Sequence, residues 1–198
     1  MKLSSKILRA LFICHLLTNI FLVLQAAKAE EINEPNCVEG DCFNPQVAIN
    51  GETVPLRGAA MFSVLNNELY TSAFYVSPDA KTYEEMLADV PKRLVIHCRR
   101  DFGKDDMINA AEKNLKSNPT LDIEKLEPQI DKLSEHMDPA KQGDEYALTY
   151  IPGKGTQFEF NGEVRVVIPG ADFARAFFGI WISPYSISQK LRLQLLAF

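Results

Sequence analysis

The chain has 198 residues, 46% of them hydrophobic and 24% charged, and its net charge is −5 at neutral pH. That length and hydrophobic content suffice for one domain with a sizeable core. The negative charge disfavours nucleic acid or an anionic membrane surface as a partner, because both are bound by clustered lysine and arginine.

The first 29 residues have the pattern of a secretory signal peptide. Basic residues precede a mostly apolar run at 10–24, and the small-x-small sequence AKA follows. A membrane-spanning helix requires about 20 apolar residues, and this run is shorter. We expect cleavage before Glu30 and a periplasmic or secreted location. Cleavage would leave 169 residues with a net charge of −9 and no apolar run that could span a membrane.

Residues 30–45 are acidic and lack hydrophobic periodicity, and we expect an extended N-terminal arm there. Cys37 and Cys42 lie in this arm, and an oxidising compartment would permit a disulfide between them. Cys98 alternates with apolar residues instead, which is typical of a buried thiol. Cysteine and histidine do not occur at zinc-ligand spacing, so neither a metal nor another cofactor is expected.

The next part of the chain has the alternation and turn signals of β-strands. Turns are expected at Asn50-Gly51 and at Asn66-Asn67, between extended runs. The run 68–76 is apolar or aromatic on both faces, which predicts a strand that is covered on two sides. The run 92–100 is expected to be a further strand.

Helical periodicity first appears after these runs. Helices are expected over 81–89 and 103–118, and a third, up to Met137, has Pro128 in its first turn because proline breaks a helix interior. Three strands at 144–152, 156–162 and 163–170 and two closing helices at 171–182 and 186–196 complete the pattern. This order predicts an α+β fold, with an antiparallel sheet that carries a layer of helices.

The sequence PGKGT at 152–156 has a superficial likeness to a phosphate-binding loop. Such a loop requires G-x-x-x-x-G-K-[ST] between a strand and a helix. Leu148 stands where the first glycine should be, and Gly155 stands where serine or threonine should follow Lys154. Since strands are expected on both sides, we interpret the glycines as the turn of a β-hairpin.

Catalytic groupings are not evident from the residues alone. His97 and His136 have no carboxylate or cysteine at ligand spacing. Arg99 and Arg100 end a strand and could clamp a ligand carboxylate, although Arg100 is more simply an ion-pair partner of the adjacent Asp101. Arg57, beside a glycine, is the other arginine that could face a pocket.

Three blocks resemble the bacterial chalcone isomerase-like domain: 56–76, 99–115 and 143–182. The third block is the most specific, since it contains Pro-Gly-x-Gly-Thr, Asn-Gly-Glu, Ile-Pro-Gly-x-Asp-Phe and Gly-Ile-Trp in the family's order. The resemblance covers about residues 46–197. It implies an open-faced β-sandwich, in which a large antiparallel sheet is covered by helices and encloses an apolar cleft.

The resemblance does not extend to the catalytic residues of the plant enzymes, which cyclise a chalcone to a flavanone. Their arginine aligns with Phe62, their threonine falls near Tyr70, and their helical Tyr, Lys and Asn fall at about Gly103, Asp106 and Ala110. A phenolate needs cations or hydrogen-bond donors around it, and most of these side chains supply neither. We therefore expect no catalytic residue here.

The family also has fatty-acid-binding members, in which an arginine and a tyrosine hold the carboxylate. The residue pattern thus predicts a signal peptide (1–29) and an acidic arm (30–45). The resemblance implies a chalcone isomerase-like domain (46–198) that binds a hydrophobic small molecule, such as a fatty acid, without catalysis. Two alternatives remain: an isomerase of the intramolecular lyase type that acts on an enone or phenol, and a structural or partner-binding periplasmic protein. The candidate ligand-binding residues are Arg57, Phe62, Tyr70, Tyr75, Arg99 and Arg100.

Overall fold

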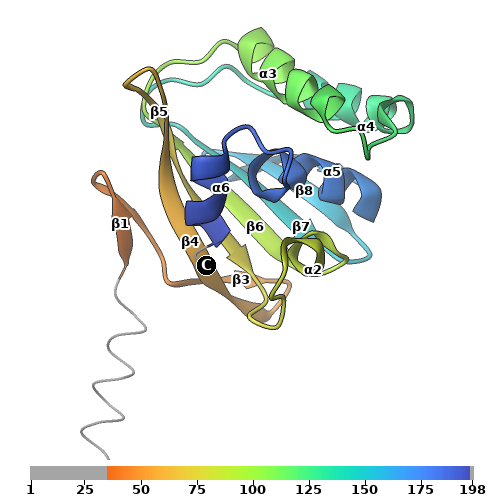
Figure 1. The fold of residues 1–198 in the computed structure, drawn as a ribbon, viewed down its shortest axis with the longest axis horizontal. Coiled ribbons are helices and arrows are strands. Elements are labelled where there is room, and N and C mark those ends of the chain that lie inside the picture. The colour runs from red at the N-terminus through yellow and green to blue at the C-terminus, as the bar shows by residue number, and fades with distance from the viewer. Residues whose placement is uncertain (1–34, 197–198) are drawn as a thin grey trace, which may run out of the picture. The chain divides into compact units, whose positions relative to one another are not determined.

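The computed structural model describes residues 35–196, and the predicted signal peptide with its cleavage site lies outside the described residues. Seven strands form one antiparallel sheet in which each strand pairs with its neighbours in the sequence (Figure 1). The sheet confirms the predicted fold class. Its strands are β3 (Gln46–Ile49), β4 (Glu52–Val64), β5 (Asn67–Val76), β6 (Lys92–Cys98), β7 (Glu145–Ile151), β8 (Gly155–Phe160) and β9 (Glu163–Ile168).

Two-residue turns in the left-handed region join several of these strands. Asn50 and Gly51 have φ values of 50° and 87°, as the Asn-Gly signal predicts. The β4–β5 turn lies one residue earlier than predicted, at Leu65 and Asn66, whose φ values are 49° and 65°. Asn67 is already paired with Val64 in the sheet, and this pairing fixes the turn.

The glycines of PGKGT form the β7–β8 turn, as predicted. Gly153 has a φ of 74° and Gly155 a φ of 115°, and a Cβ atom on Gly155 would lie 2.3 Å from the Ile168 carbonyl oxygen. Both positions therefore need glycine. Lys154 is exposed, and its Nζ donates a hydrogen bond to Asn50 Oδ1 at 2.7 Å, which links two neighbouring turns.

The helices follow the predicted periodicity, with the exception of the third helix. α5 and α6 lie across one face of the sheet, and α3 packs beside α4 and α5 (Figure 1). The helices are α2 (Tyr83–Leu87), α3 (Lys104–Ser117), α4 (Ile123–Glu135), α5 (Ala171–Ile182) and α6 (Gln189–Leu196). In the described part of the chain, none of them is long and apolar enough to cross a membrane.

The prediction for Pro128 was wrong, because the proline lies inside α4 and not in its first turn. The helix begins at Ile123, five residues earlier. An interior proline costs about 3 kcal/mol. Leu126, Ile130 and Leu133 are buried on one face of α4, and each buried side chain contributes about 1.5–3 kcal/mol. Burial of this face outweighs the proline.

The core has two layers, one on each face of the sheet. The larger layer lies under the helices and includes Phe74, Leu94, Phe158, Phe173 and Phe177. The smaller layer lies on the opposite face and includes Phe43, Ile49, Val54, Tyr75 and Val95. Both layers take side chains from β5, so the prediction of a strand covered on two sides is confirmed.

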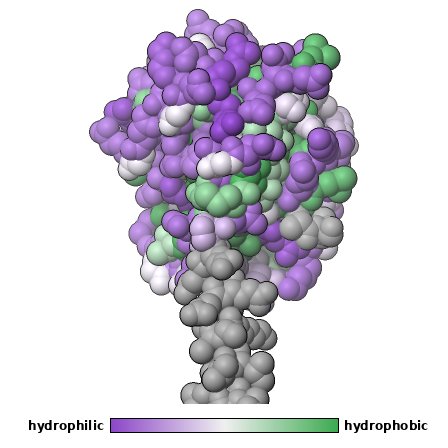
Figure 2. All heavy atoms as spheres, turned by 90° about the vertical axis from the view of Figure 1, so that its left-hand side faces the viewer, coloured by the Kyte–Doolittle hydropathy of each residue, from purple (hydrophilic) through white to green (hydrophobic). Residues whose placement is uncertain are grey.

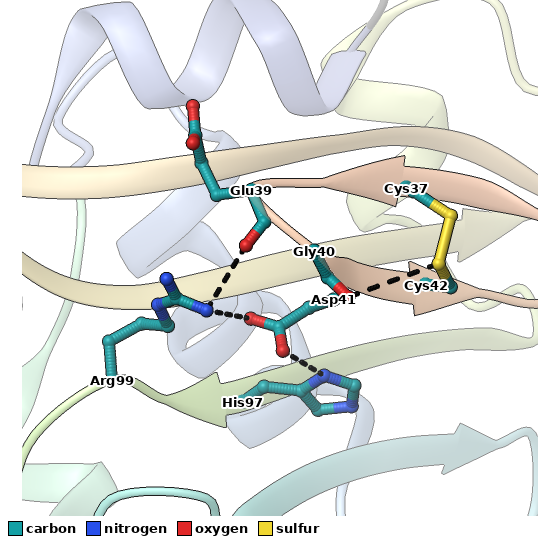
Figure 3. Close-up of a disulfide and its surroundings, with 7 residues drawn as sticks. All are labelled: Cys37, Glu39, Gly40, Asp41, Cys42, His97 and Arg99. Carbon is teal, nitrogen blue, oxygen red and sulfur yellow. Dashed lines mark hydrogen bonds and ion pairs between the residues drawn. A yellow bond between two sulfur atoms is a disulfide. The ribbon is translucent and has the colours of Figure 1, made fainter.

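The segment expected to be an extended arm forms a hairpin in the structure. β1 (Asn36–Val38) pairs with β2 (Asp41–Phe43), and a disulfide joins Cys37 to Cys42 across the pair (Figure 3). Phe43 is buried in the smaller core layer. Paired structure in the described chain therefore begins at Asn36, and the burial of Phe43 attaches this hairpin to the sheet.

Candidate functional site

A cavity of about 280 Å³ lies between the sheet and the helices. Strand alternation turns Leu94, Ile96 and Cys98 of β6 toward it, as the sequence predicts, and α3 contributes its apolar stripe. The cavity opens to solvent along α3, where its lining residues Asp106 and Ala110 are exposed. Its apolar lining consists of Phe62, Leu69, Leu94, Ile96, Phe102, Met107, Ala110, Ala111, Met137, Ala147, Leu148, Phe158, Phe177, Ile180, Trp181 and Ile187.

The hydroxyl of Tyr70 is the main hydrogen-bonding group in the interior of the cavity. Its hydroxyl oxygen accepts a hydrogen bond from Trp181 Nε1 at 3.0 Å. An indole nitrogen can only donate, so this bond does not use the Tyr70 proton, and among residues 35–196 no hydrogen bond donated by the Tyr70 hydroxyl is formed. Burial raises the pKa of Tyr70. The hydroxyl therefore stays protonated at neutral pH and can donate a hydrogen bond to a ligand.

Tyr146 and Cys98 are the other polar residues in the interior of the cavity. The Tyr146 hydroxyl donates to the backbone oxygen of Asp138, and burial raises its pKa. Burial also raises the pKa of the Cys98 thiol to about 12. Since the nucleophilic form of cysteine is the thiolate, Cys98 acts as a small apolar side chain, as expected from its position in the sequence.

Two of the six candidate ligand-binding residues lie in this cavity. The rings of Phe62 and Tyr70 lie 5.1 Å apart between their centroids, and both line it. Asp106 and Ala110, which align with plant catalytic positions, line it too. Gly103 is the N-cap residue of α3 and lies outside the lining. The structure thus brings together four of the aligned positions without their catalytic side chains.

Two further candidates, Arg57 and Arg100, do not line the cavity. Arg57 lies beside α6, and Arg100 lies at the surface. Arg57 Nε donates to the Leu196 carbonyl oxygen at 2.8 Å. The Arg100 guanidinium is exposed and lies 5.8 Å from the centroid of the Phe102 ring. The expected Arg100–Asp101 ion pair is not formed, because the Asp101 carboxylate binds Lys141 Nζ at 2.9 Å.

Tyr75 and Arg99 lie on the opposite face of the sheet. The Tyr75 hydroxyl donates to the Asn44 carbonyl oxygen at 3.0 Å. Arg99 binds the carboxylates of Asp41 and Glu68 at 3.3 and 3.1 Å. Each bond attaches a segment of chain to the sheet, and strand alternation accounts for the separation of both residues from the cavity.

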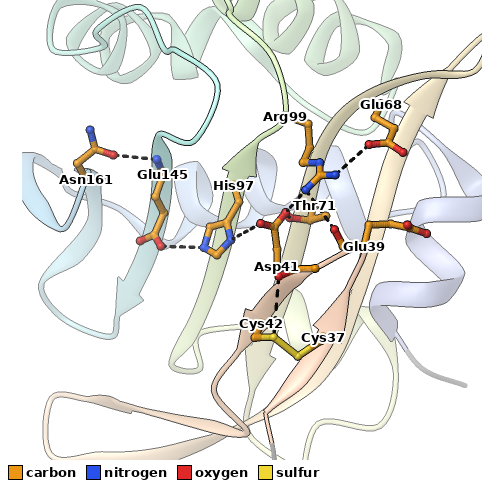
Figure 4. A network of polar contacts seen from close by, with 11 residues as sticks. Cys37, Glu39, Asp41, Cys42, Glu68, Thr71, His97, Arg99, Glu145 and Asn161 are labelled. Atoms are coloured by element: carbon orange, nitrogen blue, oxygen red, sulfur yellow. Dashed lines mark hydrogen bonds and ion pairs between the residues drawn. A yellow bond between two sulfur atoms is a disulfide. The ribbon is translucent and has the colours of Figure 1, made fainter.

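His97 belongs to the same polar network as Arg99 (Figure 4). Its Nε2 lies 2.9 Å from Glu145 Oε2, and its Nδ1 lies 3.9 Å from Asp41 Oδ1. The imidazole also stacks on Phe43. Among residues 35–196, no group of three histidine, cysteine or acidic side chains could hold a metal ion. The network fixes the β1–β2 hairpin on the sheet.

Several lining residues were not identified from the sequence. Tyr146 alternates with Leu148 on the same face of its strand, but the sequence does not show that this face points into the cavity. Met137 and Ile187 were assigned to helix faces, but they lie just beyond the end of α4 and just before the start of α6. The hydrogen bond between Trp181 of α5 and Tyr70 of β5 could not be inferred, because no signal in the sequence brings these two elements together.

Comparison with known proteins identifies the family. A family model described as chalcone isomerase-like matches residues 36–197. Among solved structures, a fatty-acid binding protein of Arabidopsis thaliana superimposes with a TM-score of 0.65 at 14% identity, over 82% of this chain and 96% of that chain. A search of curated proteins finds no match. The chain belongs to the chalcone isomerase-like family.

Proposed function

We propose that this protein is an exported, non-catalytic binder of a hydrophobic small molecule, a class to which fatty acids belong. The observation that carries this proposal is the apolar cavity of about 280 Å³ between the sheet and α3 and α5. The fatty-acid binding protein with the same fold supports it. Concave, largely apolar sites with few polar groups are typical of small-molecule binding.

The size of the cavity bounds the ligand. A cavity of about 150 Å³ holds one benzene molecule. By that scale the cavity accommodates a ligand of about 11 non-hydrogen atoms. Each buried methylene group contributes about 0.8 kcal/mol, which must exceed the cost of ordering the ligand. A medium-length chain fits these limits better than a long one.

The proposal of a non-catalytic role is supported by the side chains at the aligned positions. Phe62, Asp106 and Ala110 offer no cation or hydrogen-bond donor to a developing phenolate. Cys98 is held as a thiol. Turnover of a chalcone or a related enone, followed by its absorbance, would contradict this part of the proposal.

Export is supported by the pattern of residues 1–29 and by the disulfide between Cys37 and Cys42, since disulfides persist mainly in oxidising compartments. Expression of the whole chain, followed by N-terminal sequencing of the mature protein, tests it. We expect the sequence to begin at Glu30. An intact N-terminus in the cytoplasmic fraction would contradict export.

A cavity-filling variant tests ligand binding. Ala111→Trp places an indole in the cavity, whereas Lys113→Trp places one on the exposed side of the same helix. By calorimetric titration with 2-decanone, we expect Ala111→Trp to weaken binding at least about 10-fold, because the lost methylene contacts are each worth about 0.8 kcal/mol. Lys113→Trp should bind as the unmodified chain does. Equal binding by all three proteins would exclude the cavity as the site.

A further inference from the structure

The charge of the cavity narrows the class of ligand, an inference that rests on the proposed function. Among the described lining residues, Asp106 alone carries a charge at neutral pH, and that charge is negative. A buried carboxylate requires a cation or several hydrogen-bond donors. The interior of the cavity offers the Tyr70 hydroxyl as a donor and no lysine, arginine or histidine from residues 35–196.

Two basic side chains on strand β6 and at its end are engaged elsewhere. Lys92 lies on the helix side of β6, but its Nζ donates to the carbonyl oxygens of Ala88 and Val90 at 2.7 and 2.8 Å. Arg99 is bound within the network on the opposite face of the sheet. Because of these contacts, neither Lys92 nor Arg99 can serve as the counter-ion of a ligand anion.

A charged head group could avoid burial by remaining at the mouth of the cavity, with its chain inside. The mouth is formed along α3, where Asp106 is exposed. A ligand carboxylate would then lie near a carboxylate of the protein, and like charges repel even when water screens them. The interior of the cavity and the part of its mouth beside Asp106 therefore both disfavour an anion.

Tyr70 provides what an uncharged ligand needs. Trp181 Nε1 donates to the Tyr70 oxygen at 3.0 Å, which orients the hydroxyl and leaves its proton for an acceptor. We infer that the cavity takes an uncharged molecule whose single polar group, a carbonyl or hydroxyl oxygen, accepts a hydrogen bond from Tyr70, and that it discriminates against carboxylates of equal chain length.

A matched series of ligands tests this inference on the unmodified mature protein. Calorimetric titration at pH 7.5 compares 2-decanone, decan-1-ol, decanoate and butylbenzene, the last of which lacks a hydrogen-bond acceptor oxygen. We expect 2-decanone and decan-1-ol to bind about 10-fold more tightly than decanoate, because the carboxylate gains no partner and meets Asp106. Decanoate binding as tightly as 2-decanone would overturn the inference while leaving the proposed function intact.

A pair of tyrosine variants locates the hydrogen bond. Tyr70→Phe should weaken 2-decanone about 3- to 10-fold, the usual worth of one neutral hydrogen bond, and leave butylbenzene unchanged. Tyr75→Phe, on the same strand but the opposite face, should alter neither. An unchanged ratio of 2-decanone to butylbenzene in Tyr70→Phe would overturn the role of Tyr70.

The outcomes separate the two claims. If none of the four ligands binds, including butylbenzene, both the proposed function and this inference fail. If Tyr70→Phe does not fold, the comparison of 2-decanone with decanoate on the unmodified protein still decides whether the cavity rejects the anion.

Discussion

Tyr70 and Asp106 set the polarity of a cavity whose lining is otherwise largely apolar. The first offers a proton inside the cavity and the second a negative charge at its mouth. The Phe62 ring packs against Tyr70 and lines the cavity beside it. An apolar side chain at that position supplies no counter-ion for a carboxylate.

The charge at the mouth is testable with two neighbouring aspartates. Asp106→Asn should tighten decanoate about 2- to 3-fold at low salt and leave 2-decanone unchanged, a small effect because an exposed charge is screened. Asp105→Asn is the control, since Asp105 also lies in the first turn of α3 but outside the cavity lining. Equal effects of both substitutions would show that Asp106 has no special position.

Lys92 makes the stability of the protein depend on pH. Burial lowers the pKa of Lys92 to about 7, below the value of about 10.4 in an unfolded chain. Between these values the unfolded chain binds more protons at this side chain, so the contribution of Lys92 to stability rises with pH from about 7 to about 10. Cys98, whose pKa burial raises to about 12 from about 8.5 in an unfolded chain, has the opposite effect above about pH 8.5. Urea unfolding at pH 7 and 8.5 should therefore reveal the rise, and Lys92→Met should abolish it. A rise that persists in the variant would assign it to another group.

At the scale of elements, a disulfide closes the β1–β2 hairpin, and the carboxylate of Asp41 binds the hairpin to the sheet. Asp41 Oδ2 accepts from Thr71 Oγ1 at 2.7 Å and from Arg99 at 3.3 Å, beside the Cys37–Cys42 bond. These contacts lie on the face of the sheet opposite the cavity. Stability and ligand binding should therefore respond separately to changes in the hairpin.

Removal of the disulfide tests that separation. Replacing both Cys37 and Cys42 by serine should lower the free energy of unfolding by at most about 2 kcal/mol, because the closed loop is short. The affinity for 2-decanone should remain within twofold. Unfolding in urea measures the first quantity and calorimetric titration the second. A parallel loss of affinity would show that the hairpin supports the cavity across the sheet.

Element boundaries were predictable where a local signal fixes the backbone. Asn50-Gly51 and the glycines of PGKGT determine their turns by positive φ. The start of α4 was not predictable, because the burial of Leu126, Ile130 and Leu133 outweighs the energetic cost of Pro128 inside the helix. The segment around Cys37 was expected to be an extended arm. Its hairpin was missed because it is stabilised by contacts with Thr71 and Arg99, which are distant in the sequence.

At the scale of the whole molecule, the two faces of the sheet are covered by different parts of the chain. One face carries helices and the cavity, and the other carries the hairpin and its polar network. The outer face shown in Figure 2 is mostly hydrophilic, with hydrophobic residues in small groups. The apolar lining that is suited to a ligand lies between the sheet and the helices.

This division explains how much of the site the sequence could reveal. Alternation along β5 correctly separates Tyr70 from Tyr75, but both faces of the strand are apolar or aromatic, so no signal indicates which face the helices cover. Phe62 and Tyr70 lie in the cavity, whereas Tyr75 and Arg99 lie behind it. The family resemblance led to the first two, and side-chain type alone suggested the others.

A crystal structure of the mature protein with bound 2-decanone tests the central claim most directly. The account predicts the chain of the ligand between the sheet and α3, with its carbonyl oxygen within hydrogen-bond distance of Tyr70 Oη. A cavity closed by its own side chains, or a ligand bound outside it, would contradict the account.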